Sequence, residues 1–442
     1  MNGVPSGWTS DRLKDAAAIN AVALPAATDP DYEFDYLEIS NVDYHGIVDP
    51  NAIERLRFED APSRARRRVA AGSTVISSVR PNLQAVAFFP DASADFVCST
   101  GFNVVEPKPS RLSPQFAYYH LISENARQYF EAAATGVGYP AVGDKEFNAI
   151  AVPLPPLPEQ QRIEAYLHAS CAAIDAAVAA KRSQLETLDS LRKAIIARAV
   201  TYGITAHPKL RQVDNEWIKE VPAHWEVCRV KRVLARMDYG IGVSTIEEGR
   251  YPVLKMGHLQ DGEIRFSDLD FVDEVDESLI LETGDLLYNR TNSPDQVGKA
   301  AIFRKSRTDA ITFASYLVRL RVNHRASASF LNYVFNSNGF LGFARRLAIP
   351  SVQQSNLNST RYSRMFIPLP PVKEQESIRI YLDEKTGDIR RIVATIESQI
   401  ATLTAYRKSL IHECVTGQRR VTDEDVRRVR NSERSQPTGH RA

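Results

Sequence analysis

The sequence predicts an α+β protein in which two mixed α/β domains are each followed by a long helix. Three observations lead to this fold class: a helical segment that occurs twice, an apolar repeat of seven within each copy, and turn-rich sequence with short β-like runs before each copy. We expect the two helices to pair as an antiparallel coiled coil, which would give the chain a pseudo-twofold internal symmetry.

The duplicated segment begins at Pro153 and again at Pro368, at an offset of 215 residues. The two copies align without a gap over 49 positions, of which 21 are identical. Identity at this level within one chain indicates a tandem duplication, and an internal repeat decides the architecture before any single element does. The predicted order is a first domain over 1–152, a long helix over 153–203, a second domain over 204–367, a second long helix over 368–417, and a charged, disordered tail over 418–442.

Each copy is predicted to form one helix that starts sharply at its prolines. Proline lacks an amide hydrogen and restricts the residue before it, so the Pro-rich opening prevents regular structure from continuing into the helix. No proline occurs in the more than 40 residues that follow either opening. A helix of that length spans roughly 60 Å at about 1.5 Å per residue.

Apolar residues recur every seven positions along both predicted helices, which is the spacing of a coiled-coil seam. The simplest partner for each helix is the other copy, and the alternative is a parallel dimer with a second chain. Lys181 interrupts the first series, where a polar residue can set the register. The seam residues are Leu167, Ile174, Leu188 and Ile195 in the first copy and Leu382, Ile389, Ile396, Leu403 and Leu410 in the second.

The segments before the two helices also match each other, more loosely. Trp8 and Trp225 end similar short motifs, and Arg80 and Arg290 occupy corresponding places further along. Both segments are rich in turn residues and contain short β-like runs, which is typical of mixed α/β domains. The clearest runs cover 74–78, 85–89, 300–303 and 316–321.

The composition is that of an ordinary globular protein, with 43% hydrophobic and 25% charged residues. Apolar runs fall short of the roughly 18 residues that cross a bilayer, and the N-terminus has no signal-peptide pattern, so we expect a cytoplasmic location. The four cysteines are far apart without metal-ligand spacing, and we expect buried free thiols. With a net charge of +1, a nucleic-acid-binding surface would need positive charge concentrated locally or supplied by a partner.

Sequence motifs for catalysis are missing. The Asn/Asp-Pro-Pro-aromatic motif of DNA amino-methyltransferases does not occur, and neither does the GxxxxGKS/T phosphate loop. The histidines show no pairing suited to zinc, and no convincing carboxylate cluster of a metal nuclease is found. We therefore expect no catalytic residue, no metal and no cofactor in this chain.

The sequence contains the openings PLPPLPEQ and PLPPVKEQ of the two helices, the entry motif over 217–225 and the segment GSTVISSVRPN. Through these features, and over nearly the whole chain, it resembles the specificity subunits of type I restriction–modification enzymes. The resemblance implies a non-catalytic subunit with two target-recognition domains, each of which reads half of a bipartite, asymmetric site in double-stranded DNA. It also implies that the helices fix the distance between the halves and dock two methyltransferase subunits, to which two restriction/translocase subunits can add. S-adenosylmethionine, ATP and Mg²⁺ would then bind to those partner subunits.

Two other functions compete with this one. The first is a protein-interaction scaffold with a dimerising coiled coil and no DNA specificity, which the near-zero net charge favours. The second is a degenerate methyltransferase.

We expect DNA contacts from Arg, Lys, Asn and Gln side chains, because these groups hydrogen-bond to phosphates and base edges. For the basic run that contains Arg64, Arg66 and Arg67, the alternative is a charged face exposed to solvent. For Arg80 and Arg290, which correspond in the two domains, the alternative is structural support. For the segments before the helices, the alternative is turn formation. The candidates in the first domain are Arg64, Arg66, Arg67, Arg80, Asn82, Tyr139 and Lys145. The candidates in the second domain are Lys255, His258, Arg290, Asn292, Gln353, Gln354, Asn356 and Asn358.

Overall fold

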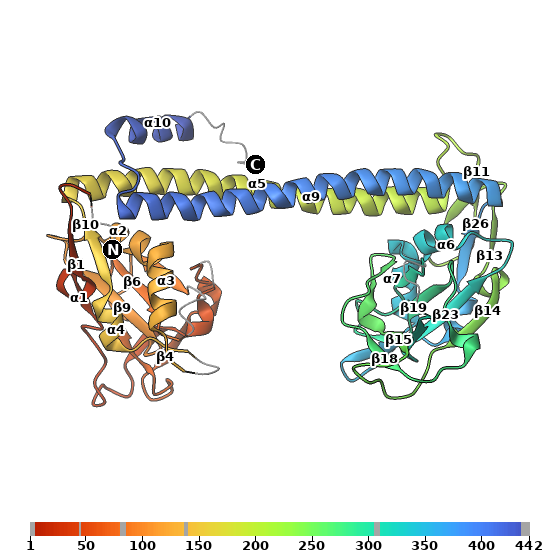
Figure 1. Ribbon diagram of the computed structural model, residues 1–442, viewed down its shortest axis with the longest axis horizontal. Coiled ribbons are helices and arrows are strands. Elements are labelled where there is room, and N and C mark those ends of the chain that lie inside the picture. Colours follow the sequence, from red (N-terminus) through yellow and green to blue (C-terminus); the bar gives the residue numbers. More distant parts are fainter. Residues whose placement is uncertain (1–4, 44–45, 80–84, 137–139, 305–309, 435–442) are drawn as a thin grey trace. The chain divides into compact units, whose positions relative to one another are not determined.

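The computed structural model describes residues 5–43, 46–79, 85–136, 140–304 and 310–434. The chain forms two compact units: unit 1 is Met1–Arg182 with Glu397–Ala442, and unit 2 is Ser183–Ile396. Both divisions fall inside long helices, α5 (Leu157–Tyr202) and α9 (Val372–Thr416) (Figure 1). Each unit is therefore a globular domain completed by one half of each long helix.

Unit 1 contains two four-stranded sheets and one two-stranded sheet among its described residues. The first sheet has the order β2-β9-β6-β7 and is antiparallel, and the second has the order β4-β3-β8-β5, with β3 and β8 parallel. The strands are β1 (Thr9–Arg12), β2 (Ala17–Ile19), β3 (Glu33–Leu37), β4 (Glu54–Arg57), β5 (Ala65–Arg68), β6 (Ser73–Ser77), β7 (Val86–Phe89), β8 (Phe96–Ser99), β9 (Phe102–Pro107) and β10 (Ala151–Leu154). The shorter helices are α1 (Leu13–Ala16), α2 (Pro114–Leu121), α3 (Glu124–Ala133), α4 (Asp144–Ala149) and α10 (Asp423–Arg434).

Unit 2 repeats this plan. Its main sheet has the order β14-β23-β19-β21 and is antiparallel, and a second sheet has the order β18-β15-β22, with β15 and β22 parallel. The strands are β11 (Leu210–Gln212), β12 (Glu220–Pro222), β13 (Glu226–Arg229), β14 (Leu234–Tyr239), β15 (Tyr251–Leu254), β16 (Leu259–Gln260), β17 (Glu263–Ile264), β18 (Asp270–Val272), β19 (Leu286–Asn289), β20 (Thr291–Asn292), β21 (Ala300–Ile302), β22 (Thr312–Phe313), β23 (Leu317–Val322), β24 (Ile349–Ser351), β25 (Gln354–Asn356) and β26 (Phe366–Leu369). The shorter helices are α6 (Ala328–Phe335), α7 (Asn338–Leu347) and α8 (Ser359–Arg364).

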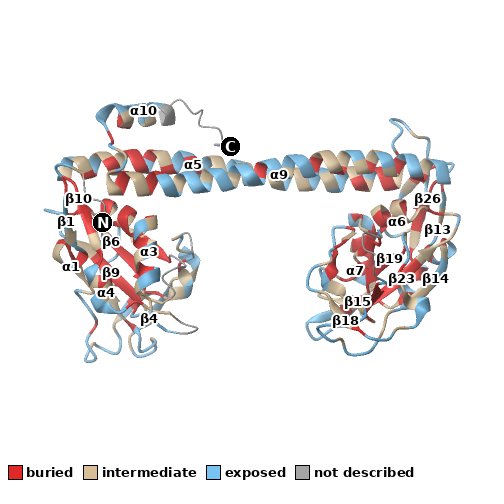
Figure 2. Cartoon of the chain, viewed as in Figure 1, coloured by how far each residue is buried: buried red, intermediate tan, exposed pale blue. Residues whose placement is uncertain are grey.

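Equivalent elements build the core of each unit. The central strands β6 and β9 of unit 1 are mostly buried, as are β19 and β23 of unit 2 (Figure 2). Helix α2 packs on β6 and β7, and the corresponding helix α6 packs on β21. The prediction of two mixed α/β domains is confirmed.

The two long helices pack against each other in antiparallel order. In unit 1 the early part of α5 meets the late part of α9, where Leu167 and Leu410 share one core. In unit 2 the late part of α5 meets the early part of α9, where Ile196 and Leu382 share the other core. The helices thus find their partners within the chain, as predicted for a coiled coil between the two copies.

None of the seam residues is exposed. Lys181 is half-buried and lies next to the point where α5 passes from unit 1 to unit 2, so the polar interruption of the seam coincides with the division between the units. The buried seam residues are Leu167, Ile174, Leu382, Ile389, Ile396 and Leu410, and the half-buried ones are Leu188, Ile195 and Leu403.

Both long helices begin four residues later than predicted, at Leu157 and Val372. The first four residues of each duplicated segment do not join the helix, because the first two lie in a strand and the next two are prolines that precede the helix. In unit 1 β10 pairs antiparallel with β1, and in unit 2 β26 pairs with β13 in the same way. Proline is tolerated there because each strand of a two-stranded sheet keeps an open edge.

A buried glutamine ties each domain to the first turn of its helix. Gln160 is fully buried. Its Oε1 accepts the backbone N–H of Ser113 (2.8 Å), and its Nε2 donates to the carbonyls of Arg111 and Pro155 (2.9 Å each). The equivalent Gln375 is also fully buried. It makes the same three hydrogen bonds, to Ser327 (2.7 Å), Arg325 (3.0 Å) and Pro370 (2.8 Å).

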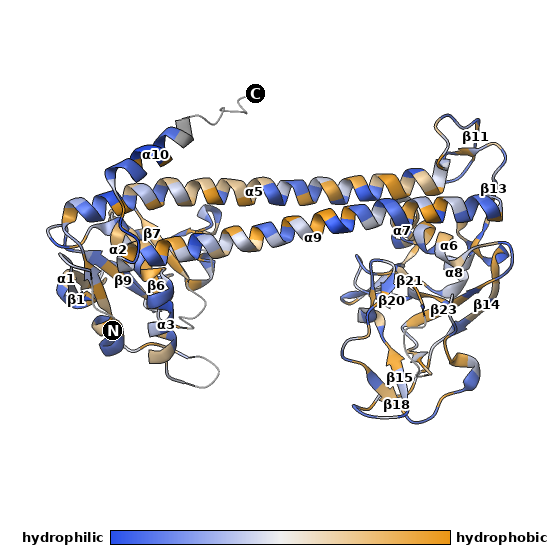
Figure 3. Cartoon of the chain, turned by 45° about the horizontal axis from the view of Figure 1, so that its top comes forward, coloured by the Kyte–Doolittle hydropathy of each residue, from blue (hydrophilic) through white to orange (hydrophobic). Residues whose placement is uncertain are grey.

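The prediction of a disordered tail over 418–442 is wrong for its first part, which contains α10. Thr422 and Asp425 cap this helix reciprocally: the Thr422 N–H donates to Asp425 Oδ2 (3.0 Å) and the Asp425 N–H donates to Thr422 Oγ1 (3.2 Å). Val421 and Val426 are buried in the core of unit 1. The rest of α10 is largely hydrophilic (Figure 3), which explains why composition alone indicated disorder.

Helix α5 contains one 18-residue window that is long and apolar enough to cross a membrane, with a mean hydropathy of 1.2, contrary to the expectation from the sequence. A single helix of this kind is weak evidence for a membrane span, because the core helix of a globular protein passes the same test. In this chain buried apolar residues of α5 share a core with residues of α9 in each unit, and 33% of the window is buried.

The four cysteines are free and buried, as predicted; they are Cys98, Cys171, Cys228 and Cys414. Burial raises the pKa of the Cys171 and Cys228 thiols to about 11. Thiols with a raised pKa stay protonated near neutral pH and are poor nucleophiles, so these cysteines contribute packing rather than reactivity.

Gln375→Ala is expected to lower the free energy of unfolding by about 2 kcal/mol, because a buried N–H and two buried carbonyls lose their partner. Thermal unfolding followed by circular dichroism measures the loss as a lower midpoint. Gln399→Ala, at an exposed position of the same helix, is the matched control and should leave the midpoint nearly unchanged. Equal midpoints for the two variants would contradict the role assigned to Gln375.

Candidate nucleic-acid interface

A small three-stranded sheet in unit 2 brings together two segments that the sequence analysis singled out separately. β20 pairs with β25, and β25 pairs with β24. The backbone of Arg290 also accepts the N–H of Leu357 (2.8 Å). The segment after Arg290 therefore lies beside the segment that precedes α9, so their polar side chains share one region of the domain.

β24 and β25 form a hairpin with a two-residue turn at Val352 and Gln353. Val352 is 91% exposed, and Gln353 takes a φ of +59°, which is uncommon for a residue other than glycine. Gln353 and Gln354 are both exposed. These two predicted contact residues are thus accessible to a binding partner.

The two asparagines of the same segment form hydrogen bonds within the domain. Asn356 Nδ2 donates to Thr291 Oγ1 (2.8 Å). Asn358 Oδ1 accepts the N–H of Arg361 (2.9 Å) and so caps α8. For Asn358 the arrangement fits the turn-forming alternative.

Arg290 is held against its own domain. Its guanidinium carbon lies 5.1 Å from the centroid of the Tyr239 ring, and Nη1 donates to the Ser315 carbonyl (3.4 Å). The neighbouring Asn292 accepts the N–H of Ser293 through Oδ1 (2.8 Å). Arg290 and Asn292 are half-buried, which favours structural support as part of the role of Arg290.

Unit 1 pairs the corresponding segments, since Val79 forms an isolated bridge with Ala141. The same short β-contact thus joins the two candidate loops in both domains. Lys145 lies on α4 and is exposed. The remaining candidates of these two loops lie outside the described residues: Arg80, Asn82 and Tyr139.

Arg67 of the basic run is directed into unit 1. Its Nη1 donates to the carbonyl of Phe102 and to Oδ1 of Asn103 (3.1 Å for the latter). The side chain is half-buried, and burial lowers the pKa of its guanidinium. These contacts connect β5 with β9 and favour a structural role.

Arg64 and Arg66 of the same run differ in their exposure. Arg64 is exposed and forms an ion pair with Glu38 (3.0 Å), and the coulombic attraction of that carboxylate raises the pKa of Arg64. Arg66 is half-buried, with its guanidinium carbon 4.5 Å from the centroid of the Phe58 ring. Arg64 is the more accessible of the two to a phosphate group.

Lys255 and His258 also have partners within unit 2. Lys255 Nζ forms an ion pair with Asp270 and donates to Thr245 Oγ1 (3.0 Å). His258 is buried, and its Nδ1 accepts the N–H of Lys255 (2.8 Å). Burial lowers the pKa of His258, so the neutral ring adds no positive charge for a phosphate near neutral pH.

Three arginines that the sequence analysis did not select border the hairpin. Arg346, Arg361 and Arg364 line a hollow of about 570 Å³ together with Ile349 and Pro350 of β24. All three are exposed. The pair Arg345-Arg346 directly before the hairpin sequence is the signal that would have indicated them.

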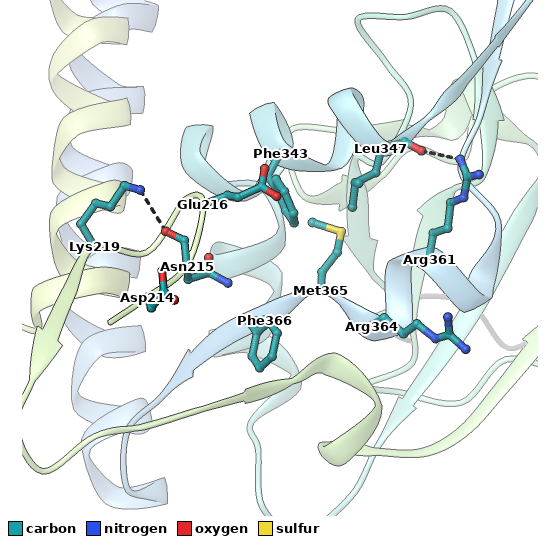
Figure 4. Close-up of a pocket in the computed structure, with 10 residues that line it drawn as sticks. All are labelled: Asp214, Asn215, Glu216, Lys219, Phe343, Leu347, Arg361, Arg364, Met365 and Phe366. Atoms are coloured by element: carbon teal, nitrogen blue, oxygen red, sulfur yellow. Dashed lines mark hydrogen bonds between the residues drawn. The ribbon is translucent and has the colours of Figure 1, made fainter. Parts of the chain in front are cut away.

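A second hollow, of about 400 Å³, adjoins the first and shares Arg361 and Arg364 with it (Figure 4). At one end Arg361 Nη1 donates to the Leu347 carbonyl (2.9 Å). At the other end Lys219 Nζ donates to the Asn215 carbonyl (3.0 Å), in the segment that also carries two acidic residues. The acidic side chains Asp214 and Glu216 therefore lie toward the Lys219 end of this hollow, whereas Arg361 and Arg364 lie at the other end.

Arg67→Ala is expected to lower the thermal unfolding midpoint by several degrees, because the Phe102 carbonyl and Asn103 lose a partly buried donor, at a cost of about 1–2 kcal/mol. Differential scanning calorimetry measures the midpoint. Lys145→Ala, an exposed change in the same unit, is the control and should leave the midpoint unaltered. A stable Arg67→Ala variant with weakened DNA binding would instead assign Arg67 to the interface.

Comparison with known proteins finds similarity to type I restriction enzyme specificity subunits. The profile of the type I restriction modification DNA specificity domain matches residues 5–187. The putative type I restriction enzyme MjaX specificity subunit of Methanocaldococcus jannaschii is 27% identical over 205 residues, which cover 45% of this chain and 47% of that protein. The type I restriction enzyme EcoKI specificity subunit of Escherichia coli is 20% identical over 433 residues, which cover 94% of this chain and 90% of that protein.

Solved structures show the same fold. A chain from a structural study of the complex assembly and conformational transition of the type I R-M system matches with a TM-score of 0.75 and 21% identity, over 94% of this chain and 99% of that one. The HsdS subunit from Thermoanaerobacter tengcongensis matches with a TM-score of 0.52 and 22% identity, over 94% of this chain and 98% of that one. Residues 5–187 thus match the type I restriction modification DNA specificity domain, and over 94% of its length the chain is similar to type I restriction enzyme specificity subunits and shares their fold.

Proposed function

We propose that this chain selects the DNA target of a type I restriction–modification enzyme, with each domain reading one half of a bipartite, asymmetric site. The observation that carries the proposal is the repetition: the main four-stranded sheets of the two units have equivalent strand orders, and each unit has the same buried glutamine at the helix start. Two domains with one framework and different surface residues suit a target whose halves differ. Similarity to type I restriction enzyme specificity subunits favours this function over an interaction scaffold without DNA specificity.

The paired helices are the proposed docking site for two methyltransferase subunits, and two restriction/translocase subunits can join them. A tandem repeat offers the same kind of surface twice, which suits two identical partners. S-adenosylmethionine, ATP and Mg²⁺ are assigned to those partners, and the assembly to the cytoplasm. In the part of the chain that the structure describes, no group of three or more His, Cys, Asp or Glu could hold a metal ion.

The chain assembled with its methyltransferase subunits is expected to methylate one bipartite motif with a fixed spacer. Single-molecule methylation profiling of DNA treated with the complex reports that motif directly, and methyltransferase subunits without this chain serve as the control. A palindromic motif or methylation without sequence preference would refute the proposal. The isolated chain should transfer no methyl group from labelled S-adenosylmethionine, and incorporation would favour the degenerate methyltransferase.

Helix length is expected to set the spacer between the half-sites. Seven residues inserted after Arg182 in α5 and seven after Ile396 in α9 preserve the heptad seam and lengthen both helices by roughly 10 Å. That length corresponds to about 3 base pairs at about 3.4 Å each, so the methylated motif should gain a spacer longer by about that amount. Complexes without insertions, assembled in parallel, provide the reference. An unchanged spacer in an assembled complex would contradict a ruler function.

A further inference from the structure

The hairpin of β24 and β25 presents its turn to solvent while its far end is anchored in unit 2. Every residue from 349 to 354 is exposed, whereas Ser355 and Leu357 are buried. Three of the exposed side chains are apolar, Ile349, Pro350 and Val352, of which Ile349 is 49% exposed and Val352 is 91% exposed. Exposed apolar side chains gathered on an anchored protrusion favour a contact surface over a connecting loop.

The turn itself has an unfavourable backbone conformation. Gln353 has a φ of +59°, where the side chain meets steric resistance that glycine would avoid. Such strain is maintained only where the surrounding structure imposes it, and it concentrates at functional positions. The pairing of Ser351 with Gln354 closes the turn and imposes this conformation.

Positive charge flanks the hairpin without acidic partners. Arg346, Arg361 and Arg364 line the hollow beside β24, and the described residues that line it include no acidic side chain. Elsewhere in unit 2 the arginines of β23 are neutralised, since Arg319 pairs with Asp238 (2.6 Å) and Arg321 with Asp285 (2.8 Å). Guanidinium groups without acidic neighbours around a hydrogen-bonding protrusion are complementary to a nucleic-acid duplex.

We infer that this hairpin enters the major groove of the second half-site and that its tip selects bases there, while Arg346, Arg361 and Arg364 hold the flanking phosphates. The inference rests on the proposed function and specifies it for unit 2. A two-stranded β-ribbon fits the major groove, which is about 12 Å wide. The three arginines lie beside β24, at the base of the hairpin, where the phosphate backbone would border the groove.

The turn residues are proposed to contact bases and the arginines to contact phosphates, and this assignment follows from the chemistry of their side chains. The Gln353 and Gln354 amides can each donate and accept, which matches the paired donor and acceptor on the major-groove edge of adenine. The methyl groups of Val352 can contact the thymine methyl group. Arginine contacts to phosphate carry no sequence information, so they strengthen binding to any duplex.

The test uses the complete methyltransferase complex and compares two sets of variants. Replacing the turn by V352N/Q353G keeps a hairpin, because Asn-Gly favours tight β-turns, but removes two of the three side chains proposed to read bases, Val352 and Gln353. Affinity for the wild-type site should fall tenfold or more while affinity for unrelated DNA stays constant. In the methylation profile, base preference should relax in the second half-site and remain intact in the first.

Arg361→Gln combined with Arg364→Gln should weaken binding to all sequences equally. The slope of log affinity against log salt should become shallower by about 2, since each lost phosphate contact removes about one unit. Arg304→Gln is the matched control, because Arg304 is an exposed arginine of the same unit, outside the long helices, that pairs with Glu263. That control should alter neither affinity nor slope.

Unchanged motif and unchanged affinity in the turn variant would overturn the assignment of the hairpin. Relaxed preference in the first half-site would also overturn it. These results are distinct from failure of the proposed function, which would appear in the wild-type complex as loss of a bipartite motif. Thermal midpoints equal to wild type show that each variant is folded, and Gln354→Ala provides a second tip variant if the turn replacement unfolds the domain.

Discussion

The architecture depends on one buried amide at the start of each long helix. A glutamine side chain can accept and donate at the same time, and Gln160 uses both abilities to bind a backbone N–H and two carbonyls that would otherwise be buried without partners. Neither leucine nor glutamate could replace it, since one forms no hydrogen bond and the other presents only acceptors when ionised. Because Gln375 repeats the arrangement, both domains meet their helices through the same contacts.

The sequence alone was sufficient to predict the features that recur at fixed periods. The offset between Pro153 and Pro368 indicated the duplication, and the apolar series through Leu167 and Leu382 indicated the antiparallel helix pair. The role of Gln160 could not be predicted, because its partner Ser113 is 47 residues away and only the fold brings them together. Helix α10 was missed because its buried side chains are few and its sequence is dominated by charge.

The candidate interface was harder to predict than the fold. The sequence does not show whether an arginine side chain is exposed to solvent or donates a hydrogen bond to a carbonyl within its own domain. Arg67 belonged to the most basic run of the first domain, yet it binds the backbone of a neighbouring strand. Arg361 was not among the predicted contact residues, yet it lies beside the exposed hairpin. The glutamines of the hairpin were selected for their chemistry, and their exposure follows from strand pairing that only the structure provides.

The way the chain is divided also has a consequence for biosynthesis. Unit 2 is a continuous stretch of sequence, whereas unit 1 joins the first part of the chain to its last. Leu410 and Val415 are fully enclosed in the core of unit 1, so that core stays open until the residues of α9 beyond unit 2 have been synthesised. The second domain can then complete its packing on the ribosome before the first, the reverse of the usual N-terminal-first order. The domain synthesised first therefore keeps an exposed apolar surface the longest and has the greatest need for protection by chaperones.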